Sequence, residues 1–180
     1  MTRVPSMLRN EDGFSLGELL VVMAVLGLML AGLLAVQMQG QYSYLMGSSR
    51  VEAQQNGRVA LELMVRELRS ARSVTAIPSA TDMTFVDENN VTIEYQLAGS
   101  TLNRVSAGTS TPLIGGVTSL TLTYYSAFNG ATNTGTTTTI AGSVQAIRIQ
   151  LVTTTENPVA SYSAASQSAV LESFVRLRNI

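Results

Sequence analysis

Residues 14–36 read FSLGELLVVMAVLGLMLAGLLAV, and beyond Glu18 this run contains no charged side chain. As an α-helix, 23 residues would extend about 35 Å, which is enough to cross the hydrocarbon core of a bilayer with some tilt. A cleaved secretory signal is the competing interpretation, but its apolar region is shorter and ends at a small-residue cleavage site. This run leads instead into Gln37-Met38-Gln39. We therefore predict a membrane-spanning helix over residues 14–36.

The segment before the apolar run is short and polar. Residues 1–13, MTRVPSMLRNEDG, are predicted to be a leader peptide rather than a folded element. Arg3 and Arg9 precede the run, and the next charged residue after it is Arg50. Because cytoplasmic flanks carry the excess of cations, we expect the amino terminus in the cytoplasm and everything after Val36 outside it.

A second helical pattern covers residues 51–72. Its apolar side chains form one stripe at helical spacing, and they are Leu61, Met64, Val65, Leu68 and Ala71. Arg58, Glu62 and Arg66 are spaced for ion pairs along the helix. We predict that Ile77-Pro78 ends the helix. Gly40, Gly47 and Gly57 weaken it, so it could bend or melt locally near them.

After Pro78 the apolar period changes from 3.6 to 2, which indicates strands with one wet face. The alternating apolar residues are Val91, Ile93, Tyr95 and Leu97, then Leu120, Leu122 and Tyr124, then Ile147, Ile149 and Leu151. Residues 171–177 are predicted to be a closing strand. Between Ser126 and Ser143 the chain is rich in Gly, Thr and Asn, which favours a mobile surface loop over a β-ribbon at a subunit contact.

These patterns predict an α+β fold in which a long amino-terminal helix packs on an antiparallel β-sheet. The expected organisation is a leader at 1–13, a transmembrane helix at 14–36, the extramembrane half of the helix at 37–72, and a β domain at 73–180.

The composition excludes most common types of catalytic site. The chain has no His, no Cys and no Lys, so it cannot build a Ser-His-Asp triad, a thiolate nucleophile, a Schiff base or an ordinary zinc site. We expect no enzyme activity and no cofactor. The formal net charge of −1 provides no broad basic surface, so nucleic acid is not an expected partner either.

Two clusters of polar residues are candidates for minor sites. Asp82, Asp87 and Glu88, with the adjacent Asn89-Asn90, offer oxygen ligands for calcium, but a solvated turn explains them better. Four arginines could form a patch for an acidic partner or DNA, although a structural use is favoured; they are Arg69, Arg72, Arg176 and Arg178.

Residues 13–22, GFSLGELLVV, resemble the class III signal of type IV prepilins. The resemblance implies that a prepilin peptidase cuts between Gly13 and Phe14 and methylates the new amine of Phe14. Glu18 would then be the fifth residue of the mature chain. A lone carboxylate in a spanning helix is costly and normally has a partner, and the Phe14 amine of a neighbouring subunit would supply one. Gly17 and Asp12 depart from the usual pattern of the family.

Residues 55–69, QNGRVALELMVRELR, and 175–179, VRLRN, are similar to parts of W-type minor pilins and of J-type pseudopilins of type II secretion. The resemblance implies a minor type IV pilin that helps to initiate or tip a pilus, with a J-type pseudopilin as the alternative. Other pilins or pseudopilins, the prepilin peptidase and the bacterial inner membrane are the implied partners. A signal-anchored extracytoplasmic β domain that binds a ligand is the rival from another class, and it would not need Gly13-Phe14 or Glu18.

Overall fold

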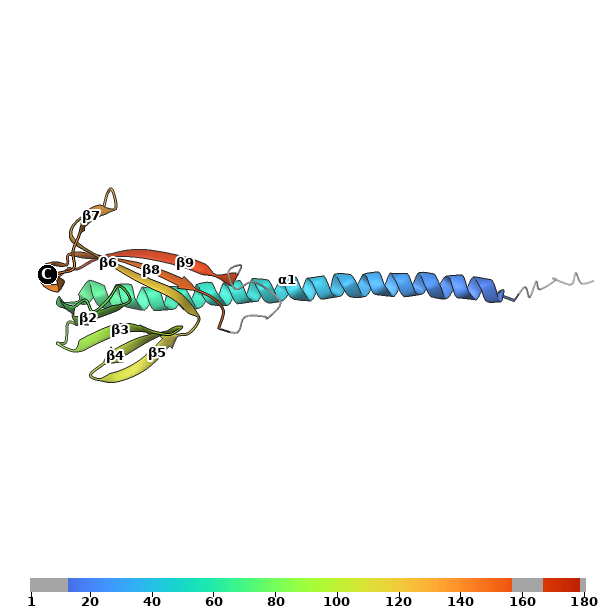
Figure 1. Cartoon of the computed structure of the whole chain (residues 1–180), viewed down its shortest axis with the longest axis horizontal. Helices are drawn as coiled ribbons and strands as arrows, with labels where there is room; N and C mark the ends of the chain where they lie inside the picture. Colours follow the sequence, from blue (N-terminus) through green and yellow to red (C-terminus); the bar gives the residue numbers. More distant parts are fainter. Residues whose placement is uncertain (1–12, 157–166, 179–180) are drawn as a thin grey trace, which may run out of the picture. The chain divides into compact units, whose positions relative to one another are not determined.

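The computed structural model describes residues 13–156 and 167–178. The chain divides into two compact units, Met1–Tyr44 and Leu45–Ile180. A single α-helix, α1 (Leu16–Ser70), contributes to both units, and antiparallel strands follow it in the second (Figure 1). The predicted α+β class, with one long amino-terminal helix and antiparallel β structure, is confirmed.

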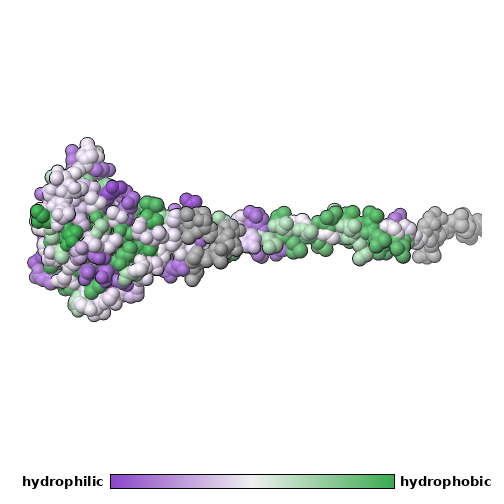
Figure 2. Space-filling model, in the orientation of Figure 1, coloured by the Kyte–Doolittle hydropathy of each residue, from purple (hydrophilic) through white to green (hydrophobic). Residues whose placement is uncertain are grey.

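In the first unit, α1 carries exposed apolar side chains. Its most apolar 18-residue window has a mean hydropathy of 2.9, and none of that window is buried. Figure 2 shows hydrophobic side chains covering this part of the helix. The helix is thus long and apolar enough to cross a membrane.

The second unit contains two antiparallel sheets rather than the single sheet that the sequence predicted. The first sheet has the order β1-β2-β3-β4-β5, with strands β1 (Ser73–Ala76), β2 (Asp82–Val86), β3 (Thr92–Ala98), β4 (Thr101–Ser106) and β5 (Thr109–Ile114). The second has the order β7-β6-β8-β9, with strands β6 (Val117–Asn129), β7 (Thr134–Thr137), β8 (Ala146–Thr153) and β9 (Ala169–Arg176). A 3₁₀ turn, η1 (Ala141–Ser143), precedes β8.

The chain passes from the first sheet to the second through Gly115-Gly116. Gly116 has a φ of +66°, and a Cβ added there would lie 2.3 Å from the carbonyl oxygen of Thr154. A residue with a side chain would be both strained and obstructed, so glycine makes this tight crossing possible.

The carboxyl-terminal part of α1 shares one hydrophobic core with both sheets (Figure 1). Of the predicted helical stripe, all members are buried except the half-buried Val65. The helix stripe meets Phe85 and Tyr95 from the first sheet and Ile149 from the second. The three strands predicted from alternation correspond to β3, β6 and β8, and the predicted closing strand corresponds to β9.

Two predictions about boundaries were wrong. The helix ends at Ser70 and not at Ile77-Pro78, because the Arg72 amide already donates to the Val86 carbonyl oxygen at 2.9 Å and starts the β1–β2 pairing. Part of the predicted loop is instead a hairpin, since β6 continues to Asn129 and pairs with β7. Aromatic contacts support this extension, because Phe128 packs on Phe174 with ring centroids 5.4 Å apart.

The expected weak points in the helix do not interrupt it, since α1 is continuous from Leu16 to Ser70. Gly57 is buried against the second sheet. A Cβ added to Gly57 would lie 2.5 Å from Leu171 Cδ1 and 3.0 Å from Thr153 Oγ1. This glycine therefore serves packing rather than flexibility.

Candidate functional site

Residues 13–18 form the start of α1. Gly13, Phe14 and Ser15 precede the first helical residue, and the Phe14 side chain is 82% exposed. An added Cβ at Gly13 would meet nothing within 4 Å. No contact among the described residues therefore requires a glycine at this position, and both Gly13 and Phe14 are exposed.

A reciprocal pair of hydrogen bonds caps the helix here. The Glu18 amide donates to Ser15 Oγ at 3.2 Å, and the Ser15 amide donates to Glu18 Oε2 at 3.0 Å. This arrangement is a capping box, which satisfies two backbone amides that the first helical turn leaves without partners. Our sequence interpretation missed the role of Ser15, although the pattern Ser-x-x-Glu ahead of an apolar run signals it.

Glu18 is placed to do more than cap the helix. Its negative charge lies in the first turn, where the helix dipole favours it. Glu18 Oε2 accepts the Ser15 amide, whereas Oε1 has no hydrogen-bond partner among the described residues. One carboxylate oxygen therefore remains able to accept a hydrogen bond from a cationic group outside the chain.

The structure does not bring the calcium candidates together. Asp82 begins β2, while Asp87 and Glu88 follow the end of that strand. Asp87 Oδ1 instead accepts the amides of Asn89 at 2.8 Å and Val91 at 2.7 Å, so it closes the turn between β2 and β3. Within residues 13–156 and 167–178, no three acidic side chains gather as a metal site would require.

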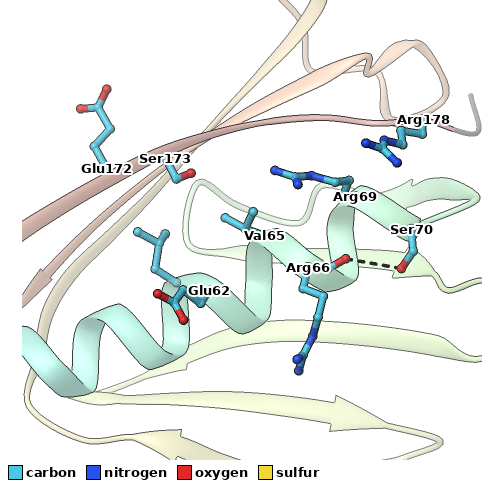
Figure 3. Close-up of a pocket in the computed structure, with 9 residues that line it drawn as sticks. Glu62, Val65, Arg66, Arg69, Ser70, Glu172, Ser173 and Arg178 are labelled. Carbon is cyan, nitrogen blue, oxygen red and sulfur yellow. Dashed lines mark hydrogen bonds between the residues drawn. The ribbon is translucent and has the colours of Figure 1, made fainter.

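The four candidate arginines are brought together only in part. Arg69 and Arg178 line one groove between α1 and the end of β9, as Figure 3 shows. Arg72 Nη1 donates to Asn90 Oδ1 at 3.0 Å, away from that groove. Arg176 is exposed and does not line the groove.

A partly buried polar cluster, which the sequence did not reveal, links the first sheet to α1. The Tyr95 hydroxyl donates to Glu67 Oε2 at 2.6 Å, and Arg104 Nη2 lies 3.0 Å from Glu67 Oε1. Burial, followed by the hydrogen bond to Glu67, raises the pKa of Tyr95 far above its usual range. Nothing in the local pattern links these three positions, which lie far apart in the chain.

Comparison with known proteins identifies the amino-terminal region. Residues 8–34 match the prokaryotic N-terminal methylation motif, a match that includes Gly13, Phe14 and Glu18. No curated protein matches the chain. The motif, together with the apolar helix that begins within it, supports a type IV pilin-like protein with a single membrane anchor.

Proposed function

We propose that this chain is a minor type IV pilin, a structural subunit that helps to initiate or tip pilus assembly. The observation that carries the proposal is the methylation motif at residues 8–34, which lies directly on an unburied apolar helix. A J-type pseudopilin of type II secretion has the same amino-terminal requirements and is the second candidate. The subunits that co-purify with the protein distinguish the two systems.

In this proposal, residues 1–13 are a leader that stays on the cytoplasmic side of the inner membrane. The prepilin peptidase cuts the Gly13-Phe14 bond and methylates the new Phe14 amine. Residues 14–36 anchor the subunit, residues 37–72 continue the helix outside the membrane, and residues 73–180 form the β domain outside the cytoplasm. The surroundings of Gly13 support this proposal. The described residues leave room for a side chain at this position, so a requirement of the peptidase would explain why the residue is glycine.

Glu18 then recognises a neighbouring subunit. The carboxylate already accepts the Ser15 amide through Oε2, and Oε1 accepts the cationic amine of a neighbour's Phe14. Such a charge pair is strong in a low-dielectric setting because little water competes for either group. The apolar helices pack together around it and form the core of the filament.

Mass spectrometry of the membrane-extracted protein tests the processing step. We expect a mature chain that begins at Phe14 and carries one methyl group on its amine. Gly13→Leu should block cleavage by crowding the peptidase site, whereas Gly17→Ala, four residues further on, should leave it intact. A mature chain that begins after Val36 would show ordinary signal removal and refute the proposal.

Substitutions of Glu18 test the assembly step. Glu18→Ala and Glu18→Gln should be inserted and cleaved normally, but should co-purify with about tenfold less partner pilin, because the neighbour's amine loses its counter-charge. Glu18→Asp should retain part of the assembly. Equal assembly by all three variants would mean that Glu18 acts only as a helix cap.

A further inference from the structure

A groove of about 620 Å³ runs beside the last turns of α1 and the end of β9 (Figure 3). Leu61 and Val65 provide its apolar part, and Ser173 of β9 also lines it. Leu61 is almost fully buried, whereas Val65 is half-buried. The groove therefore presents an apolar floor that an incoming side chain can contact.

The charges at the groove are unbalanced. Its two carboxylates are already paired within the chain, Glu62 with Arg58 at 3.3 Å and Glu172 with Arg148 at 2.7 Å. Arg66 also lines the groove, but its side chain points away from β9 (Figure 3). Arg69 and Arg178 have no acidic partner in the part of the chain that the structure describes. Figure 3 shows their side chains extending into the same space from opposite walls. A carboxylate bound in this space could pair with both guanidinium groups.

The strand that forms one wall has a free edge. Among the described residues, β9 is the last strand of its sheet and pairs only with β8. The consecutive residues Glu172 and Ser173 both line the groove, although their side chains point to opposite faces of the sheet. The groove therefore follows the edge of β9, where unpaired backbone groups can accept an extended segment as an added strand.

We propose that this groove binds an extended acidic segment of a neighbouring pilin-like subunit. The segment adds to the edge of β9, places an apolar side chain against Val65, and bridges Arg69 and Arg178 with a carboxylate. This inference rests on the proposed function, because it names the kind of partner that an assembly subunit would bind there. Two arginines at one point do not provide the row of phosphate contacts that a DNA duplex requires.

Binding to the detergent-solubilised full chain tests the proposal. The probe is an eight-residue peptide of alternating valine and threonine that ends in two glutamates and carries an uncharged fluorophore. We expect binding by fluorescence anisotropy, weakened about tenfold when glutamines replace the glutamates. Arg69→Ala and Arg178→Ala should weaken it similarly. Arg72→Ala and Arg176→Ala, which remove nearby arginines outside the groove, should not.

A variant that gains binding to a different peptide shows that misfolding does not cause the loss of binding. The double variant Arg69→Glu/Arg178→Glu should prefer a peptide that ends in two lysines over the glutamate peptide. Backbone amides of β9 should exchange more slowly with deuterium when the glutamate peptide is bound. Three results would each overturn the proposal. The first is equal binding of the glutamate and glutamine peptides, and the second is unchanged deuterium exchange at β9. The third is a 20-base-pair DNA duplex that binds at Arg69 and Arg178 more tightly than the glutamate peptide.

The two proposals fail separately. The same preparations are analysed for their amino terminus, so a chain that begins at Phe14 but binds no peptide refutes the groove alone. A chain that binds the peptide but begins elsewhere refutes the pilin assignment alone.

Discussion

Replacing Glu67 by glutamine tests how the first sheet is held to α1. Glu67 accepts the Tyr95 hydroxyl at 2.6 Å and two guanidinium nitrogens of Arg104, with Nε at 3.1 Å and Nη2 at 3.0 Å. Glutamine keeps the size of the side chain but removes its charge. Its amide group faces either Arg104, which cannot accept a hydrogen bond, or Tyr95, whose hydroxyl would have to change from donor to acceptor.

The structure sets the magnitude of the loss. A hydrogen bond to a charged group contributes about 1.5–3 kcal/mol, and glutamine can still accept one of those present. The side chains of Arg104 and Glu67 are 26% and 19% exposed, so water reaches the released arginine only partly. We expect Glu67→Gln to lower the free energy of unfolding by about 2–3 kcal/mol.

Glu62→Gln on the same helix is the matched control. Its ion pair with Arg58 has side chains that are 78% and 71% exposed, so water and salt screen it. Such exposed pairs contribute about 0.3–0.5 kcal/mol. Both variants remove one carboxylate paired with one arginine, and they differ in burial and in the Tyr95 hydrogen bond that Glu67 accepts.

Urea unfolding of the full chain in detergent, followed by tyrosine emission, measures both variants. Tyr95→Phe adds a third comparison, because it removes the hydroxyl but keeps the Glu67–Arg104 ion pair, and it should cost about 1 kcal/mol. If Glu67→Gln lowered the free energy of unfolding no more than Glu62→Gln, the partly buried cluster would not hold the sheet to the helix as we argue.

Two further predictions concern packing and pH. Gly57→Ala should be about 1–3 kcal/mol less favourable than Gly47→Ala in the same unfolding assay, because the added methyl group obstructs the second sheet at position 57 but meets nothing within 4 Å at position 47; equal effects would contradict the close contact. Burial chiefly raises the pKa values of Tyr95 and Tyr124, so both should stay protonated in the folded state above pH 10, where unfolded tyrosines ionise. The contribution of these two tyrosines to stability should therefore be constant below about pH 10 and fall above it, and a urea midpoint that stays flat from pH 8 to 11.5 would refute this sign.

The sequence alone was sufficient where the cause is local. The apolar, charge-free residues 19–36 predict, without any distant partner, a helix long and apolar enough to cross a membrane, and α1 is such a helix. The motif around Gly13 and Phe14 is equally local, and it matched the methylation motif found by comparison. Apolar and polar residues alternate in the sequences of β3, β6 and β8 because each strand buries one face against the helix.

Only the tertiary structure decided features that depend on distant partners. β5, TSTPLI, is exposed along most of its length and contains Pro112, which an edge strand tolerates, so its sequence carries no strand pattern. The end of α1 was misplaced because pairing between β1 and β2 stops the helix before the proline does. The convergence of Arg69 and Arg178, like the Glu67 cluster, arises when strands return to the helix from far along the chain. Short-range periodicity records which face of an element is buried, but not which other element buries it.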